Sequence, residues 1–326
     1  MQKVFISREW PSNYHELLQD RGVEASVWPE YDVPTHAEFC DASRGAAAIV
    51  STIEDPIDGA VMDAAGRGLR IIAQAGVGFD NIDIEAARQR KVWVTNAPGV
   101  LDECTADLAF ALLMAVARRL PEAVDYVRED KWSGWHPSLL AGAELHGATI
   151  GVVGLGRIGA AFARRCEGFG MRILYTARSA KPEAEARGYE HAPLERLLAE
   201  SDFVSLHVPL TPETRGLIGE RELEIMKPTA ILVNTARGAV VDTDALVRAV
   251  SDKQIAGAGL DVTDPEPMRA THPAVGDPRI VVLPHIGSAG LATRRKMYEL
   301  ALQNVMRVFD GQNPLHALVT PQTEGQ

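Results

Sequence analysis

The stretch ATIGVVGLGRIG, residues 148–159, decides the fold of this 326-residue chain. Residues 149–153 form a short run rich in β-branched side chains, which is typical of a buried strand. The glycines follow as Gly154-x-Gly156-x-x-Gly159, and apolar residues then continue at the spacing of one helix face as far as Cys166. This order predicts a strand, a tight turn and a helix.

Each of the three glycines has a steric reason to be there. Gly154 allows the tight turn, Gly156 lets a pyrophosphate approach the backbone, and Gly159 lets the helix pack closely on the sheet. The N–H groups of the first helical turn lack intrahelical partners and would bind the pyrophosphate. The same pattern also occurs as a purely structural turn, but the strand before it and the helix after it favour a dinucleotide site.

Composition limits the class of protein. With 46% hydrophobic and 24% charged residues the chain is ordinary for a globular protein, and it is long enough for two domains. A net charge of −11 argues against nucleic acid and against an anionic membrane surface as partners. Three cysteines in apolar settings predict reduced thiols, and without a signal sequence or a run of about 20 apolar residues we expect a soluble, cytoplasmic protein.

Short apolar runs alternate with helical patterns along the whole chain, which predicts parallel sheets. In the first hundred residues we expect strands at 4–6, 46–50, 70–73 and 91–94, with helices at 14–21 and 84–90. From residue 149 we expect about six more strands, at 149–153, 172–175, 203–207, 230–234, 256–261 and 280–283. Long helices are expected at 101–120 and 288–309. The predicted fold class is therefore α/β, with two doubly wound parallel-sheet domains: one flavodoxin-like, the other a Rossmann dinucleotide-binding domain.

Two further segments leave alternatives open. The loop Ala75-Gly76-Val77-Gly78 follows a strand, and its backbone N–H groups would suit an anion as well as they would suit an ordinary tight turn. The segment after residue 120 carries Trp132 and Trp135, which form either a surface for a partner or local packing.

The tip of the second strand of the dinucleotide domain indicates the cofactor. A site for NAD usually has a carboxylate about 20 residues after the first glycine, where it binds the ribose 2′-OH. Here the tip reads Ala177-Arg178-Ser179, and its cation and hydroxyl suit a 2′-phosphate better. The alternative is a solvated arginine neutralised by Glu183 and Glu185. We therefore favour NADP(H) and keep NAD(H) as possible.

Three ionisable residues follow strands of the dinucleotide domain, at the edge where open α/β sheets bind ligands: Arg237, Glu266 and His285. Each has an ordinary explanation alone. Together they match the needs of 2-oxo acid reduction, which are a cation for the carboxylate and carbonyl, a proton donor near neutral pH, and a carboxylate that keeps the donor charged. The other histidines show no metal-ligand spacing, so no metal is expected.

Five motifs in order give the chain a resemblance that spans nearly its whole length. It resembles the D-isomer-specific 2-hydroxyacid dehydrogenase family, and within it the glyoxylate/hydroxypyruvate reductases. The matching stretches are GVGFDNID (76–83), VVGLGRIG (152–159), NTARGAVVD (234–242), AGLDVTDPEP (258–267) and PHIGSA (284–289).

The resemblance implies roles for individual residues. Arg237, Glu266 and His285 would be the catalytic trio, and the N–H groups of Val77 and Gly78 would bind the substrate carboxylate. Trp135 matches an arm residue that reaches the neighbouring subunit of a homodimer. The residues implied in cofactor binding are Thr105, Gly154, Leu155, Gly156, Arg157, Ile158, Gly159, Ala177, Arg178, Ser179, His207, Val208, Pro209, Thr214, Thr235, Ala236 and Asp261.

The resemblance also implies a discontinuous layout, with residues 1–99 and 288–326 as the substrate domain and 100–287 as the dinucleotide-binding domain. The expected reaction is NADPH-dependent reduction of a small 2-oxo acid, such as glyoxylate or hydroxypyruvate, with His285 as proton donor. The alternatives are an NAD(H)-dependent enzyme for another 2-oxo acid such as phosphohydroxypyruvate, and a non-catalytic, dinucleotide-sensing co-repressor. Formate dehydrogenase is disfavoured, because that branch has glutamine where Glu266 stands.

Overall fold

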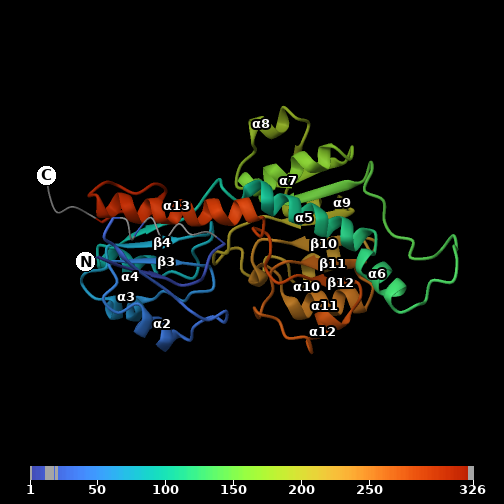
Figure 1. The fold of residues 1–326 in the computed structure, drawn as a ribbon. Helices are drawn as coiled ribbons and strands as arrows, with labels where there is room; N and C mark the ends of the chain where they lie inside the picture. Colours follow the sequence, from blue (N-terminus) through green and yellow to red (C-terminus); the bar gives the residue numbers. More distant parts are fainter. Residues whose placement is uncertain (1, 12–17, 19–20, 322–326) are drawn as a thin grey trace. The chain divides into compact units, whose positions relative to one another are not determined.

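The protein forms two compact units in the computed structural model, which describes residues 2–11, 18 and 21–321 (Figure 1). Unit 1 comprises residues 1–101 and 289–326, and unit 2 comprises residues 102–288. The helix expected at 14–21 falls mostly on residues outside the described part of the chain.

Unit 1 is built on a sheet whose described strands run in the order β13-β5-β4-β3-β1-β2. Their bounds are β1 Lys3–Ile6, β2 Glu24–Val27, β3 Ala48–Ser51, β4 Ile71–Gln74, β5 Trp93–Thr95 and β13 Ala317–Val319. All pair in parallel except β13, which is antiparallel to β5. The four predicted strands are confirmed with small shifts in their bounds, and β13 adds an antiparallel strand at one edge of the parallel sheet. Both β2 and β13 are short edge strands that show too little apolar alternation to be recognised from the sequence.

Successive side chains of the central strands point to opposite faces of the sheet and enter different cores. In β1, Phe5 packs with the helices α2 (His36–Ala42), α3 (Gly59–Ala65) and α4 (Ile84–Gln89). Val4 and Ile6 pack instead with α13 (Leu291–Phe309), which covers the other face (Figure 1). The predicted helix at 288–309 is therefore confirmed from residue 291 onward.

Unit 2 contains a larger sheet in which every strand pair is parallel, with the order β12-β11-β10-β9-β6-β7-β8. Its strands are β6 Thr149–Val153, β7 Arg172–Thr176, β8 Glu190–His191, β9 Phe203–Leu206, β10 Ile231–Asn234, β11 Gly257–Leu260 and β12 Ile280–Val282. The six predicted strands are confirmed, and β8 is an additional edge strand. Chain order reverses at β6, which lies between β9 and β7, and the carboxyl ends of strands at such a point form the usual ligand site of an open α/β sheet.

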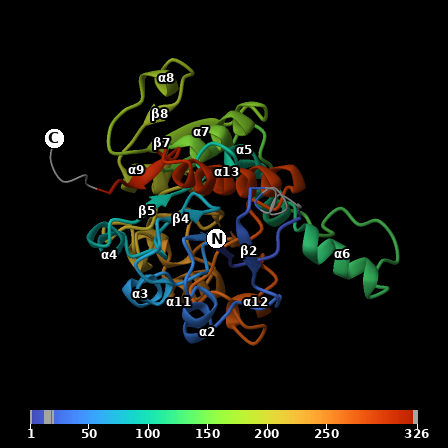
Figure 2. The same ribbon diagram turned by 60° about the vertical axis from the view of Figure 1, so that its left-hand side comes forward.

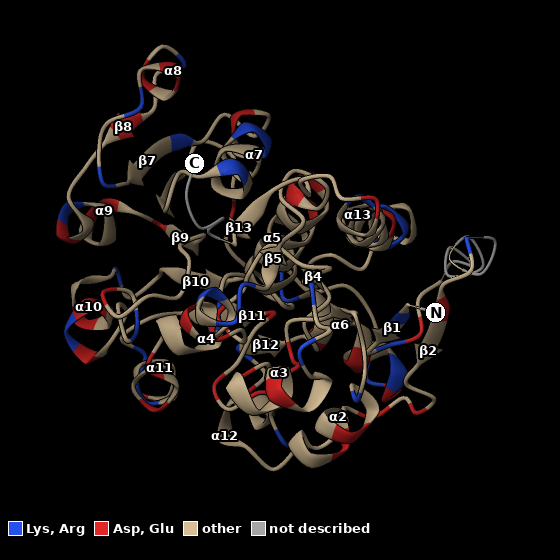
Figure 3. Cartoon of the chain, turned by 90° about the vertical axis from the view of Figure 1, so that its left-hand side faces the viewer, with Lys and Arg blue, Asp and Glu red and all other residues tan. Residues whose placement is uncertain are grey.

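Helices cover both faces of this second sheet. One face packs on α5 (Asp102–Ala117) and α7 (Arg157–Glu167), and the other on α9 (Leu194–Glu200), α10 (Glu220–Ile225) and α11 (Thr243–Ser251). The remaining helices are short: α6 Leu120–Arg128, α8 Pro182–Glu185, α12 Pro273–Gly276 and the 3₁₀ turn η1 Gly238–Val240. Charges of both signs occur on α7, α10 and α11 (Figure 3).

The helix expected at 101–120 ends earlier than predicted. α5 stops at Ala117, and a new helix begins at Leu120, after Arg119 adopts a left-handed conformation with φ of 53°. The returning chain caps α5, because the Ala143 N–H donates to the Ala117 carbonyl at 2.8 Å. A Cβ atom on Gly142 would lie 2.1 Å from that carbonyl oxygen, so only glycine fits there.

Two expectations concern the whole chain. Cys40, Cys104 and Cys166 are all free thiols, in agreement with the sequence. Among the described helices, none combines the length and the apolar character that crossing a membrane requires.

Candidate active site

The glycine turn between β6 and α7 has the geometry that its sequence predicts. Gly154 has a φ of +94°, and a Cβ atom there would lie 2.9 Å from the carbonyl carbon of His207. A Cβ atom on Gly159 would lie 2.1 Å from the Gly154 oxygen, so this glycine allows α7 to pack against the turn. Gly156, by contrast, has no atom within 4 Å of the position that a Cβ atom would take. The space beside Gly156 is therefore open for a ligand.

The residues around this turn fit a bound dinucleotide. Gly156 is the N-cap of α7 and has no side chain to cap it, and the first backbone hydrogen bond of the helix runs from the Ala160 N–H to the Gly156 carbonyl at 2.9 Å. Earlier N–H groups of the helix have no acceptor among the described residues. Thr235 Oγ1 and His207 Nδ1, at the ends of the nearby strands β10 and β9, are buried and lack a hydrogen-bond partner in the described structure. A ligand bound at these strand ends would supply the missing partners.

Arg178 and Ser179 are exposed just after β7, the strand that pairs with β6. The Gly154 N–H donates to the Thr176 carbonyl at 2.9 Å, which places the tip of β7 beside the glycine turn. No ion pair between Arg178 and Glu183 or Glu185 is found in the part of the chain that the structure describes. Arg178 is thus a solvated arginine in this structure, and its contact with a 2′-phosphate stays a prediction.

His207 is neutral at pH 7. Its Nε2 lies 2.9 Å from Ser205 Oγ, and its ring centroid lies 5.0 Å from that of Phe162. Burial of the imidazole lowers its pKa to about 3, because the charged form would lose its hydration.

The other residues implied in cofactor binding lie on loops and helix ends of unit 2. Thr214 Oγ1 donates to the Pro209 carbonyl at 2.6 Å and so closes the loop after Val208. Thr105 is buried in the first part of α5, with its Cγ2 atom 3.4 Å from the Cβ position of Gly287. Ala236 donates its N–H to Asn234 Oδ1 at 3.0 Å, which fixes the chain after β10.

His285 and Glu266 are brought together by the fold. His285 Nδ1 lies 2.5 Å from Glu266 Oε1, and the second carboxylate oxygen accepts the Thr263 N–H at 3.3 Å. The His285 and Glu266 side chains are 25% and 28% exposed, so the pair is open to a ligand on one side. Since Nδ1 is occupied by the carboxylate, Nε2 is the ring nitrogen left for a substrate.

A buried carboxylate holds the loop that carries His285. Asp261 is 1% exposed and accepts the N–H of Ile286 on Oδ1 and that of Gly287 on Oδ2, both at 2.8 Å. The His285 N–H donates to the Asp261 carbonyl at 2.9 Å, and His285 has a left-handed φ of 52°. Burial raises the pKa of Asp261 even though the two N–H groups oppose the rise. The resemblance implied a cofactor contact for Asp261, and the structure shows in addition that this residue fixes the histidine loop.

Arg237 lies on the loop after β10, and that loop packs against the one that carries Glu266. A Cβ atom on Gly238 would lie 1.9 Å from the Thr263 oxygen, so glycine is required for this contact. Asn234 Nδ2 donates to the Arg237 carbonyl at 2.8 Å and fixes the backbone beside the guanidinium. The three residues of the predicted trio therefore extend from the same edge of one sheet.

The loop Gly76–Gly78 of unit 1 is held from behind by three donors. The Ala97 N–H donates to the Gly76 carbonyl at 2.8 Å, Asn96 Nδ2 to the Val77 carbonyl at 2.8 Å, and Gln74 Nε2 to the Gly78 carbonyl at 3.0 Å. Sequence analysis did not identify Gln74 or Asn96. Each is an amide at the carboxyl end of an otherwise apolar strand, but the sequence does not show which backbone atoms it reaches.

The segment after α6 exposes a large apolar surface. Trp132 is 65% exposed and Trp135 is 85% exposed, and α6 has no buried residue. Figure 2 shows α6 and the following segment extending away from the sheet of unit 2. Local packing of the two tryptophans is therefore wrong as an explanation, and a surface for a partner is the alternative that remains.

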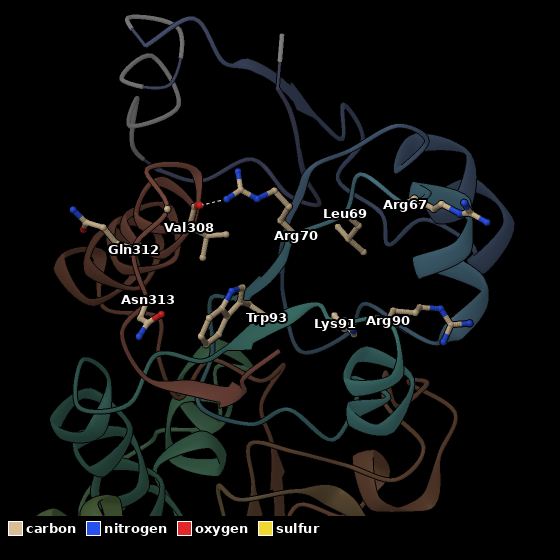
Figure 4. A pocket seen from close by; sticks show the side chains of 10 residues that line it. Arg67, Leu69, Arg70, Arg90, Lys91, Trp93, Val308, Gln312 and Asn313 are labelled. Carbon is tan, nitrogen blue, oxygen red and sulfur yellow. Dashed lines mark hydrogen bonds between the residues drawn. The ribbon is translucent and has the colours of Figure 1, made fainter. Parts of the chain in front are cut away.

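A cavity of about 380 Å³ lies at the opposite edge of the unit 1 sheet, before β4 and β5 (Figure 4). Two of its cations are engaged: Arg90 pairs with Asp63 at 2.8 Å, and Arg70 donates to the Val308 carbonyl and lies over the Phe309 ring. It contains none of the predicted site residues, which lie at the carboxyl ends of the strands instead. No group of three or more His, Cys, Asp or Glu side chains that could hold a metal ion occurs among the described residues.

Comparison with known proteins agrees with this geometry. Residues 110–287 match the family model described as D-isomer specific 2-hydroxyacid dehydrogenase, NAD binding domain. The chain is 48% identical over 314 residues to a glyoxylate reductase of Korarchaeum cryptofilum, covering 96% of this chain and 94% of the relative. The crystal structure of a Thermus thermophilus protein superposes with a TM-score of 0.93 at 49% identity, covering 98% of this chain and all of that one.

An NADPH-dependent glyoxylate/hydroxypyruvate reductase of Sinorhizobium meliloti, solved with NADP and malonate, has a TM-score of 0.86 at 32% identity, with 99% of each chain covered. The chain belongs to the D-isomer-specific 2-hydroxyacid dehydrogenase family. It is accordingly an NAD(P)-binding oxidoreductase that reduces a 2-oxo acid.

Proposed function

We propose that this enzyme uses NADPH to reduce glyoxylate or hydroxypyruvate to the D-2-hydroxy acid. The observation that carries the proposal is the His285–Glu266 pair on the sheet edge that also holds the glycine turn. NADPH, when bound, supplies the hydride that C2 of the substrate accepts. The residues of the chain then have to orient the oxo acid, polarise its carbonyl and deliver one proton.

In this proposal His285 delivers the proton. Nε2 donates to the substrate carbonyl oxygen and protonates it as the alkoxide develops, while Glu266 at Nδ1 orients the ring and stabilises its charged form. Arg237 binds the substrate carboxylate and polarises the carbonyl, since a planar guanidinium matches both oxygens. The N–H groups of Val77 and Gly78 bind the carboxylate as well.

The proposed cofactor contacts follow the open turn and the strand tips. Arg178 and Ser179 bind the 2′-phosphate, which agrees with the NADPH dependence of the Sinorhizobium meliloti relative. The pyrophosphate lies at the N-terminus of α7, beside Gly156. The remaining proposed contacts are Thr105, Leu155, Arg157, Ile158, Ala177, His207, Val208, Pro209, Thr214, Thr235, Ala236 and Asp261.

We further propose that unit 1 is the substrate domain and unit 2 the dinucleotide-binding domain. The exposed tryptophans 132 and 135, together with the apolar side chains of α6, support a homodimer formed through this surface. Sedimentation of the protein as a monomer at micromolar concentration would contradict this part of the proposal.

The test is the initial rate of glyoxylate and hydroxypyruvate reduction with NADPH and with NADH, followed by nicotinamide absorbance. Turnover with preference for NADPH is expected. Faster turnover with NADH would keep the enzyme and overturn the assignment of Arg178. Absence of turnover with both acids would favour another oxo acid, such as phosphohydroxypyruvate, or a protein that only senses the dinucleotide.

Arg178→Ala sharpens the cofactor test. Loss of a charge-assisted hydrogen bond to phosphate costs about 1.5–3 kcal/mol, so KM for NADPH should rise by about 10- to 100-fold. KM for NADH should stay within about twofold, because NADH has no 2′-phosphate. Lys181→Ala, which removes a nearby cation, is the matched control. Equal effects of Arg178→Ala on both cofactors would contradict the assignment.

A further inference from the structure

The carboxamide of Asn96 is placed to control where the loop of unit 1 can bind an anion. Asn96 follows β5, and the loop Gly76–Gly78 follows β4, the strand that pairs with β5. Asn96 is 8% exposed, and its Nδ2 lies 2.8 Å from the Val77 carbonyl oxygen. Only the amide nitrogen can face that oxygen, because two acceptors would repel each other.

Because the peptide group is planar, the contact between Asn96 and the Val77 carbonyl also fixes the direction of the Gly78 N–H. The carbonyl of one residue and the N–H of the next point in opposite directions across the peptide plane. Fixing the Val77 carbonyl toward Asn96 therefore fixes the Gly78 N–H away from it. In the same way, the Ala97 N–H holds the Gly76 carbonyl at 2.8 Å and so aims the Val77 N–H.

The two N–H groups so aimed have no acceptor within the described part of the chain. On the other side of the loop, Gln74 is 1% exposed and holds the Gly78 carbonyl at 3.0 Å. Its amide also bonds Asn81 Oδ1 at 2.9 Å and the Ser51 hydroxyl at 2.6 Å, so Gln74 is itself rigid. The loop is thus held through its three carbonyl groups, and the N–H groups of Val77 and Gly78 are left to bind a ligand.

We propose that Asn96 is a positioning residue for the carboxylate of the substrate. It does not contact the substrate but orients the Gly78 N–H, in advance of binding, toward the carboxylate oxygen. This inference rests on the proposed function, which assigns the N–H groups of Val77 and Gly78 to the substrate carboxylate. Preorganised donors of this kind cost no reorganisation when the ligand binds.

The test compares two substitutions that remove the donor in different ways. Asn96→Asp keeps the shape but presents an acceptor to the Val77 carbonyl, so the peptide should rotate. At pH 8 we expect KM for glyoxylate to rise about tenfold or more, with a smaller change in kcat. Asn96→Ala removes the donor without adding a charge, and its KM should rise severalfold.

The pH dependence distinguishes positioning from a merely structural role. The carboxyl group introduced by Asn96→Asp gains an O–H when it is protonated, and this O–H can donate to the Val77 carbonyl. The ratio of the Asn96→Asp KM to the wild-type KM should therefore fall as pH decreases from 8 to 5.5. The corresponding ratio for Asn96→Ala should stay constant. A raised Asn96→Asp ratio that does not change with pH, or wild-type KM values for both variants, would overturn the proposal.

Asn304→Asp is the matched control. Asn304 is a buried amide of the same unit, 1% exposed, and it accepts the Leu315 N–H at 2.7 Å without touching the loop. Its substitution should lower thermal stability and leave KM for glyoxylate unchanged. An equal rise of KM in this control would show that the effect of Asn96→Asp is general destabilisation.

Oxalate separates this inference from the proposed function, because it carries the same carboxylate but cannot be reduced. Its affinity for the NADPH-loaded wild type and variants is measured by calorimetry. If wild type reduces glyoxylate while the Asn96 variants match it in KM and oxalate affinity, the inference is wrong and the proposed function stands. If no oxo acid is reduced, weaker oxalate binding by Asn96→Ala still supports the inference, and failure of wild type to bind oxalate overturns it.

Discussion

The two sheet edges hold their functional loops in opposite ways. In unit 2 a buried carboxylate, Asp261, accepts the N–H groups of Ile286 and Gly287, so the loop turns its donors inward and presents a side chain, His285. In unit 1 two buried amides, Gln74 and Asn96, donate to loop carbonyls, so that loop turns its acceptors inward and presents its N–H groups.

The contrast shows how one architecture serves two tasks. A buried acceptor leaves a loop to act through its side chains, which can carry a proton, whereas buried donors leave a loop to act through its backbone, which binds an anion without titrating. In both units the fixing residue lies at or just beyond a strand end and is less than a tenth exposed. Rigid fixation behind the loop, rather than the loop itself, is what the two sites share.

The largest effect should come from the side chain that unit 2 presents. His285→Gln keeps a hydrogen-bond donor but cannot deliver a proton, so kcat for glyoxylate should fall by about 10²- to 10⁴-fold. NADPH affinity, measured by fluorescence titration, should change little. His191→Gln, at an exposed histidine of the same unit, should be without effect. Near-normal turnover of His285→Gln at every pH would mean that His285 is not the proton donor. The loop of unit 2 would then only bind a ligand, like the loop of unit 1.

A smaller effect should follow from loosening the loop while keeping His285. Asp261→Asn can accept only one of the two N–H groups and leaves the other unsatisfied, at a cost of about 1–3 kcal/mol. We expect kcat to fall about tenfold and thermal stability to drop. Asp252→Asn, at an exposed carboxylate of unit 2, is the control. Unchanged kcat in Asp261→Asn would break the parallel between Asp261 and the amides of unit 1.

Asp261 also gives a direction for pH dependence. Because burial raises its pKa, protonation begins at a higher pH than for an ordinary aspartate, and a protonated oxygen no longer accepts both N–H groups. Activity that depends on this loop should therefore be lost on the acid side, and the Asp261→Asn variant should lack this part of the loss.

The second histidine at the same edge, His207, should make stability depend on pH. The unfolded chain binds a proton at His207 below about pH 6.5, whereas the folded chain does not until about pH 3. The resulting stability is present above pH 6.5 and is lost as pH falls, by about 1.4 kcal/mol per pH unit for one proton. Urea unfolding from pH 7 to 4 should show this slope, and His207→Gln should flatten it. An equal slope in both proteins would show that His207 takes up its proton in the folded state.

Much of the fold could be predicted because its signals are local. The glycine pattern at 154–159 and the buried runs of β6, β9 and β10 follow from steric rules that act within a few residues. The edge strands β2, β8 and β13 were not predicted, because pairing with a neighbouring strand, rather than their own composition, makes them strands. The end of α5 at Ala117 was not predicted, because the residues that cap it, Gly142 and Ala143, lie much further along the chain.

The reactive residues of the site could be proposed from the sequence because their chemistry is visible in the side chain. The residues that fix the loops could not, since Gln74 and Asn96 act through contacts with backbone atoms brought close by the sheet. The pairing of β4 with β5 is what places Asn96 beside the Val77 carbonyl, and a sequence does not state which strands are neighbours.

The antiparallel strand at the edge of unit 1 has a consequence for how the protein is made. β13 comes from the last residues described, and it completes a sheet whose other strands lie within the first hundred. During synthesis on the ribosome, the outer edge of β5 stays unpaired until all of unit 2 has been made. The face of the sheet that α13 later covers stays exposed for the same time. Unit 2 can therefore fold during synthesis, while unit 1 can be finished only after α13 and β13 have been synthesised.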